Sequence, residues 1–286
     1  IRHMEVELLQ NELSPKLMNL VRKFDHPTHA SNTLTLELIS DRISKQINQK
    51  VVIAGEGSDE IFAGYKRYKI ISDHYIESGK DPNILVYGFN KVAIERLKLL
   101  TEDAEITNQK RWSIERECRS TQPVTRFLEL DQQTFLRPYL LRQDHVGMMH
   151  SLEMRTPFLD HNLVEFANSL PDQYKIHTEM DGFVWHKYIL RKVAERYLPA
   201  EIVWNRKKYQ FTAPASVSLY NGSLRRLFFN YLDDNLRISK YYSSNGIKRL
   251  LNEHEVGMTY GKHSDHSNTL WRLLNLEIWL RSLDCG

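Results

Sequence analysis

Two carboxylates, Glu56 and Asp59, stand in a glycine-rich turn directly after the apolar run of residues 51–54. The run is rich in β-branched side chains, which predicts a short buried strand. Gly55 and Gly57 allow the backbone to turn tightly and to approach a ligand closely. Acids and glycines in this order predict a turn that binds a small charged ligand.

A helix is expected after this turn, with Ser58 and Asp59 as N-caps of residues 60–68 and beyond. A strand, a glycine turn and a helix N-terminus direct backbone N–H groups at one spot, which favours an anion. Because the two carboxylates would repel a bare phosphate, a bridging cation such as Mg²⁺ is the natural partner. The plain alternative is a strand–turn–helix corner whose acids only cap the helix.

A second charged stretch, residues 136–160, reads L-R-P-Y-L-L-R-Q-D-H-V-G-M-M-H-S-L-E-M-R-T-P-F-L-D. Helical spacing predicts one face made of Leu141, His145, Met148, Met149 and Leu152. Asp144 and Glu153 are the acids of this stretch that could serve a site. The alternative is that they form salt bridges with Arg142 and Arg155, because such pairs are common.

A third stretch, residues 201–214, reads E-I-V-W-N-R-K-K-Y-Q-F-T-A-P and places three cations in a row between aromatic residues. These cations are Arg206, Lys207 and Lys208, and the stretch is expected to form a loop. Such a cluster is usually ordinary surface charge. Its other interpretation is a basic loop that reaches a bound anion.

The elements that position these residues begin with a predicted half-buried strand, because apolar and acidic residues alternate over residues 1–9. Helical spacing predicts helices over residues 14–24 and 34–47, which lead into the strand of residues 51–54. A strand, helices and a second strand are consistent with one crossover of a parallel sheet.

Helical periods dominate after residue 70, with helices expected over residues 83–100, 110–130, 161–170, 187–197 and 268–283. Asp160 is the expected N-cap of the third of these helices. The last helix is apolar on most sides, so Trp271 and Trp279 are expected in the core. The predicted fold class is α/β passing into mostly α.

The totals exclude several function classes. The 39 basic residues exceed the 36 acidic ones by +3, too little to predict nucleic-acid binding. Cys118 and Cys285 give neither metal-ligand spacing nor a disulfide framework, which fits a cytoplasmic protein. No apolar run approaches a membrane span and no signal peptide is visible, so no membrane partner is expected.

The motif G-E-G-S-D-E-I-F-A-G-Y, residues 55–65, resembles the second nucleotide-binding motif of the asparagine synthetase family. Residues 136–160 resemble the family pattern L-L-R-x-D-R-x-x-M-x-x-S-L-E-x-R-x-P-F-L-D, with His145 where arginine is usual. The basic loop resembles R-R-K-K-x-G-F-x-x-P, with Gln210 in place of glycine. The tail resembles the closing L-W-x-L-L-x-L-E-x-W-L-R, and the four stretches keep the family's order.

This resemblance implies ATP-dependent amide formation through an acyl adenylate, with ATP and Mg²⁺ as cofactors. It also implies part of a doubly wound, parallel-sheet ATP-pyrophosphatase-type fold. Residues 1–70 would be the remainder of the nucleotide-binding sheet, and residues 71–286 a mainly helical substrate-side region. Ala54, Gly55 and Glu56 would contact ATP, and Asp59 would hold Mg²⁺ on the pyrophosphate.

The resemblance places the catalytic lysine at Lys208, counting back from Phe211, with Lys207 as the alternative. Lys208 would neutralise charge on the phosphates in the transition state. Glu56 would orient the adenylate or accept a proton from the attacking amine. Asp144 would support that network, and Glu153 is a further candidate.

The family's first phosphate loop, of pattern S-G-G-x-D-S, does not occur in this sequence, and neither does the glutamine-hydrolysing domain. The chain therefore resembles the last two thirds of a synthetase domain. A truncated chain, a split gene whose N-terminal partner chain or glutaminase domain is separate, and an inactive relative or scaffold all stay open. The substrate class is a small-molecule or peptide carboxylate, including cell-wall and polysaccharide acids. Glu56 favours joining two molecules, because β-lactam-forming relatives tend to carry tyrosine there.

Overall fold

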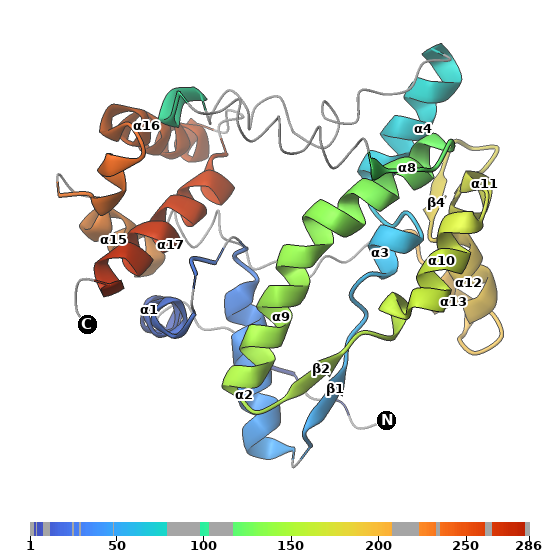
Figure 1. Cartoon of the computed structure of the whole chain (residues 1–286), viewed down its shortest axis with the longest axis horizontal. Coiled ribbons are helices and arrows are strands. Elements are labelled where there is room, and N and C mark those ends of the chain that lie inside the picture. The colour runs from blue at the N-terminus through green and yellow to red at the C-terminus, as the bar shows by residue number, and fades with distance from the viewer. Residues whose placement is uncertain are drawn as a thin grey trace.

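A computed structural model shows a mostly helical chain with two small sheets (Figure 1). It describes residue 3 and residues 5–7, 12–24, 26–28, 30–47, 49–78, 98–102, 117–207, 223–232, 235–260 and 265–283. Among these residues, no helix combines the length and apolar character needed to cross a membrane.

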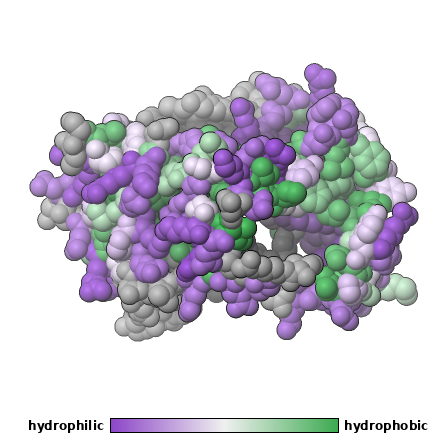
Figure 2. Space-filling model, turned by 90° about the horizontal axis from the view of Figure 1, so that it is seen from below, coloured by the Kyte–Doolittle hydropathy of each residue, from purple (hydrophilic) through white to green (hydrophobic). Residues whose placement is uncertain are grey.

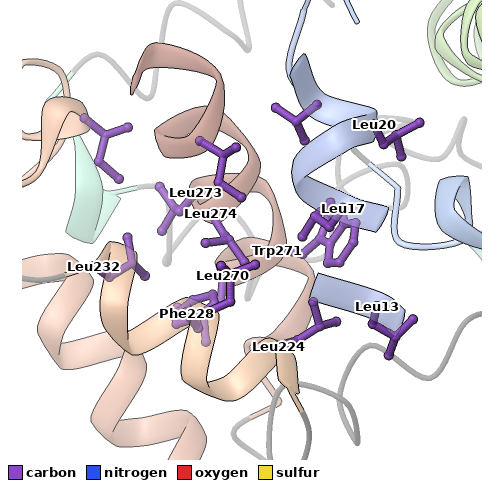
Figure 3. Close-up of a cluster of buried hydrophobic side chains, with 14 of the residues drawn as sticks. Leu13, Leu17, Leu20, Leu224, Phe228, Leu232, Leu270, Trp271, Leu273 and Leu274 are labelled. Atoms are coloured by element: carbon purple, nitrogen blue, oxygen red, sulfur yellow. The ribbon is translucent and has the colours of Figure 1, made fainter. Parts of the chain in front are cut away.

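A helical bundle forms one side of the molecule, at the left of Figure 1. It consists of α1 (Leu13–Lys23), α15 (Ser223–Tyr231), η4 (Arg237–Lys240), α16 (Ser244–Tyr260) and α17 (Ser267–Leu283). Leu17, Trp271 and Leu274 are fully buried where α1 meets α17 (Figure 3). The buried tail helix is confirmed, and the half-buried Trp279 packs against the same core.

The glycine-rich turn of residues 55–59, here termed the acid turn, lies within a crossover between two parallel strands. β1 (Val51–Ile53) pairs in parallel with β2 (Glu153–Arg155), with Val52 opposite Met154. Between them come α3 (Ser58–Ile61), α4 (Lys66–Ser78), α8 (Pro123–Asp131), the π-helical turn η2 (Gln132–Leu136) and α9 (Arg137–Met149). The crossover predicted between residues 1–9 and 51–54 is not formed by the described residues; the parallel crossover instead joins β1 to β2, and α2 (Thr33–Gln46) lies against α9 beside it.

The expectation that β1 is buried is wrong for the described residues. Val51 is 39% exposed and Ile53 is 75% exposed. β-Branched residues on both faces predict a strand covered on both sides, yet β1 pairs only with β2 among the described residues. Figure 2 views the molecule from the side on which β1 and β2 lie and shows hydrophobic patches among hydrophilic ones.

The expected single helix after the acid turn is also wrong. The N-cap of α3 is Gly57, whose φ of 89° lies in the left-handed region that glycine tolerates. The Ser58 hydroxyl donates to the Gly55 carbonyl oxygen rather than capping the helix. The chain then turns through Ala63, at a φ of 55°, before α4 begins. This break turns the chain sharply between the two helices.

The predicted apolar face of α9 is wrong for Leu141 and Met148, whereas Met149 packs against the core and Leu152 is buried just beyond the helix end. Leu141 is 46% exposed and Met148 is 59% exposed, and the buried residues of α9 are Arg142, Gln143, Val146 and Gly147. A Cβ on Gly147 would lie 2.8 Å from the Leu152 carbonyl oxygen, so glycine permits close packing of α9 on the segment before β2. The helix therefore faces inward with small and polar residues.

The remaining described elements form the side of the molecule at the right of Figure 1. They are η3 (Pro157–Leu159), α10 (His161–Ser169), α11 (Asp172–Lys175), β3 (Ile176–Thr178), β4 (Val184–His186), α12 (Tyr188–Ala194) and α13 (Ala200–Val203). β3 and β4 form an antiparallel hairpin. Asp160 caps α10 as predicted, because its carboxylate accepts from the N–H groups of Asn162 and Leu163.

Several expectations fall partly outside the described residues: most of the helix over 83–100, the start of the helix over 110–130, the strand over 1–9 and the basic loop from Lys208 onward. Within the described part of residues 110–130, residues 118–122 are not helical and α8 begins at Pro123. The described part of residues 1–9, residue 3 and residues 5–7, forms no strand.

Candidate active site

The backbone around Gly55 is shaped for close approach. The Ala54 N–H donates to the Arg155 carbonyl oxygen at 2.8 Å, so a ligand at Ala54 would meet its carbonyl oxygen instead. Gly55 is exposed, and no described atom beyond its chain neighbours lies within 4 Å of a Cβ placed on it. The turn therefore presents open backbone directly after β1.

Asp59 is held in place by a lysine that is distant in the sequence. The Lys187 Nζ lies 3.0 Å from Asp59 Oδ2 and donates to the Ser58 hydroxyl oxygen at 2.8 Å. Lys187 stands just before α12 with a φ of 55°, a left-handed conformation that is rare for lysine. The backbone at Lys187 therefore stores strain where it aims an ammonium at the acid turn.

Gly64 makes room for this pair. A Cβ on Gly64 would lie 1.7 Å from Asp59 Oδ1 and 2.5 Å from Lys187 Cε. The Gly64 N–H also donates to the Asp59 carbonyl oxygen at 2.9 Å, which closes the turn after α3. Any side chain at position 64 would have to displace the carboxylate and the lysine.

The pair opens into a groove of about 680 Å³. Its walls come from α4, β4, the start of α12 and the segment after α13, and its cationic lining residues are Lys66, Lys69, Lys187, Arg191, Arg206 and Lys207. Three of these six pair with carboxylates, through Asp59, Asp73 and Asp181. The groove is therefore positive overall, which suits a polyanionic ligand.

Glu56 faces a different cation, the buried guanidinium of Arg142. Arg142 Nη2 lies 3.9 Å from Glu56 Oε1. Burial raises the pKa of Glu56 above its ordinary value, and the Arg142 charge offsets part of that rise. The neighbouring carboxylate of Asp59 raises it further, whereas Lys187 lowers it. A carboxyl group balanced in this way suits proton transfer.

The other predicted site residues lie in different surroundings. Asp144 on α9 and Glu153 in β2 are both exposed. The Glu153 carboxylate accepts a hydrogen bond from Arg155 Nε at 2.8 Å. The salt-bridge alternative is therefore realised for Glu153. Lys207 lines the groove, while Lys208 lies outside the described residues.

Sequence reasoning missed Lys187, Gly64 and the inward direction of Arg142. Lys187 reads as the first residue of an ordinary helix, and no local signal connects it to a turn 128 residues earlier. A glycine directly after Ala63 in the acid motif was the available signal for Gly64.

The groove fits a phosphate-bound magnesium ion better than a free one. Within the described ranges, no group of three or more His, Cys, Asp or Glu side chains could hold a metal ion. Asp59 therefore suits a Mg²⁺ that takes its remaining oxygens from phosphates and water, as this ion commonly does. The lysines of the groove suit the phosphates themselves.

Comparison with known proteins identifies the family of the chain. A family model described as asparagine synthase matches residues 1–281. Asparagine synthetase 1 (glutamine-hydrolyzing) of Bacillus subtilis is 26% identical over 314 residues, which cover 96% of this chain and 47% of that protein. Asparagine synthetase 3 (glutamine-hydrolyzing) of the same organism is 28% identical over 219 residues, which cover 72% of this chain and 33% of that protein.

A further relative, the asparagine synthetase (glutamine-hydrolyzing) of Gallus gallus, is 27% identical over 210 residues, covering 73% of this chain and 28% of that protein. The chain thus spans about half the length, or less, of the curated relatives that it matches. Because the family model covers nearly every residue, the chain belongs to the asparagine synthase family.

Proposed function

We propose that the protein containing this chain forms amide bonds with ATP through an acyl adenylate. A substrate carboxylate attacks the α-phosphate of ATP and releases pyrophosphate. An amine, usually ammonia, then attacks the acyl carbon and displaces AMP. The observation that carries this proposal is the Asp59–Lys187 pair, which joins the acid turn to a groove lined by six cations.

In this proposal the acid turn and the groove divide the work. Asp59 would hold Mg²⁺, which would supply positive charge against the negative charge of the departing pyrophosphate. Lys187 and the basic loop, through Lys208 or Lys207, stabilise the same charge from fixed positions. Backbone groups of Ala54 and Gly55 contact ATP.

The second step needs a proton acceptor, because the attacking amine must lose a proton. Glu56 takes this role as an ionised carboxylate, or orients the adenylate. Asp144 lies on the exposed side of the same helix as Arg142 and supports the site from outside. Glu153 takes part only if a ligand breaks its pair with Arg155.

The test is exchange of labelled pyrophosphate into ATP with a panel of acidic substrates. The chain is assayed alone, joined to a segment carrying S-G-G-x-D-S, and with a glutaminase domain that supplies ammonia. Substrate-dependent exchange is expected with the joined segment, with Asp59→Asn inactive and the remote surface variant Asp41→Asn unchanged. Folded protein that shows no exchange with any acid would contradict the proposal and favour a non-catalytic scaffold.

A further inference from the structure

Arg142 is a buried cation whose contacts are unusual for a salt bridge. Its side chain is 3% exposed, and its Nη1 donates to Asn32 Oδ1 at 2.5 Å. Its guanidinium lies 4.4 Å from the centre of the Tyr139 ring. Its Nε–H has no hydrogen-bond acceptor among the described residues. The guanidinium is therefore fixed by an amide and an aromatic ring, and not by a carboxylate.

The distance between Arg142 and Glu56 allows their charges to attract without a hydrogen bond. At 3.9 Å, Arg142 Nη2 is too far from Glu56 Oε1 for a hydrogen bond but close enough for strong electrostatic attraction. A bidentate pair would occupy both carboxylate oxygens. Here the charge acts on Glu56 while its oxygens keep their capacity to accept a proton.

The segment before Arg142 supports this fixed position. The π-helical turn η2 leads into α9, and such turns occur often at functional sites. The ring centres of Phe135 and Tyr139 are 4.9 Å apart, and Arg67 lies over Phe135 at 4.4 Å. The tilted ring of Phe135, with Arg67 over it, therefore supports the Tyr139 ring on which the guanidinium of Arg142 rests.

We propose that Arg142 is a positioning residue for the reaction: it holds Glu56 from the interior side and keeps it ionised without occupying its oxygens. The inference rests on the proposed function, in which Glu56 must be ionised to accept the proton of the amine. The charged or titratable groups that act on Glu56 are Arg142 from α9, Asp59 from α3 and Lys187 before α12. The Glu56 charge in turn contributes to raising the pKa of Glu60 and of Tyr139.

The experiment compares pH–rate profiles of amide formation in the joined protein. Arg142→Met removes the charge, so Glu56 should protonate more readily and the acidic limb should move up by about 1–2 pH units. Activity should return at higher pH, which a purely structural defect would not produce. Arg137→Met is the matched control, because Arg137 is exposed on the same helix, and its limb should stay in place.

Carbon-13 NMR of the Glu56 carboxyl, identified by its loss in Glu56→Gln, should show the same upward movement without turnover. If Arg142→Met does not fold, Arg142→Gln replaces it: the amide also removes the charge while it can still form a hydrogen bond to Asn32, so the acidic limb should again move up. An unmoved limb and an unmoved carboxyl titration in a folded variant would overturn the inference. Absence of amide formation in the wild type would instead refute the proposed function.

Discussion

Gly64→Ala tests whether the Asp59–Lys187 pair performs chemistry. The new Cβ would lie 1.7 Å from Asp59 Oδ1 and 2.5 Å from Lys187 Cε, both far below van der Waals contact. The overlapped atoms belong to the ends of flexible side chains, and the left-handed residue is the neighbouring Ala63. The acid and the lysine should therefore move apart while the backbone keeps its path.

The expected cost falls on catalysis rather than on folding. Loss of one preorganised charge costs about 10²–10³ in kcat, or about 2.7–4 kcal/mol of transition-state stabilisation. The free energy of unfolding should change by no more than about 1 kcal/mol, because no buried apolar contact or backbone hydrogen bond is removed. Labelled pyrophosphate exchange measures the first quantity, and urea unfolding measures the second.

A double-mutant cycle identifies the cause. If Gly64→Ala acts by displacing the Asp59 carboxylate, it should do little more in an Asp59→Asn background, so that the two losses are strongly non-additive. Fully additive losses would refute the reasoning, since the alanine would then act on something other than Asp59. A variant with normal exchange would show that the pair is only a surface salt bridge.

Three further predictions follow from single side chains. Lys208→Ala should lower kcat about 10²–10³-fold in the exchange assay with little change in KM, and Lys207→Ala should lower kcat much less. If Lys207→Ala is the inactive variant, the catalytic lysine is one residue earlier than counted from Phe211; if both variants are active, the basic loop carries only surface charge. Lys175 is fully buried, and burial lowers its pKa from 10.5 to about 8. Between these two pH values the unfolded chain binds more protons than the folded chain, so the unfolding free energy measured in urea should rise with pH by about 3 kcal/mol. Lys175→Met should abolish that rise, and an unchanged dependence on pH would contradict the reasoning. Glu277 is fully buried and accepts from the N–H groups at positions 237 and 238 and from the guanidinium at position 281, so Glu277→Gln should cost about 2–3 kcal/mol of unfolding free energy, whereas the exposed-pair variant Asp41→Asn should cost less than about 1 kcal/mol.

Local sequence rules predicted the elements whose cause is local. Asp160 caps α10 because its own carboxylate reaches the next N–H groups. The tail helix is buried because it is apolar on most sides, and Trp271 lies in its core with 1% of its surface exposed. The strand after residue 50 also followed from its β-branched run, although its parallel partner is β2 and not the strand expected over residues 1–9.

The errors occurred where distant contacts decide the conformation. β2 contains Glu153 and Arg155 and no β-branched residue, so its strand comes from pairing with β1 rather than from propensity. Leu141 and Met148 fit a helical apolar stripe, yet the tight approach at Gly147 turns them outward. In the site, the acids were visible in one motif, but Lys187 enters from another segment through a strained backbone that sequence spacing does not reveal.

The proposed site has two halves, the acid turn and the opposite wall that carries Lys187. The acid turn is tied to β2 through Ala54 and to the interior through Gly57 and the buried residues of α3. The opposite wall depends on α12, which has no buried residue, and α13, in which only Val203 is buried. The half-buried Ile189 and Leu190 of α12 pack against the cluster that contains Ile61 and Phe62, so partly exposed contacts join this wall to the acid turn. Lys187, with its left-handed backbone, lies where these contacts bring the wall against Asp59.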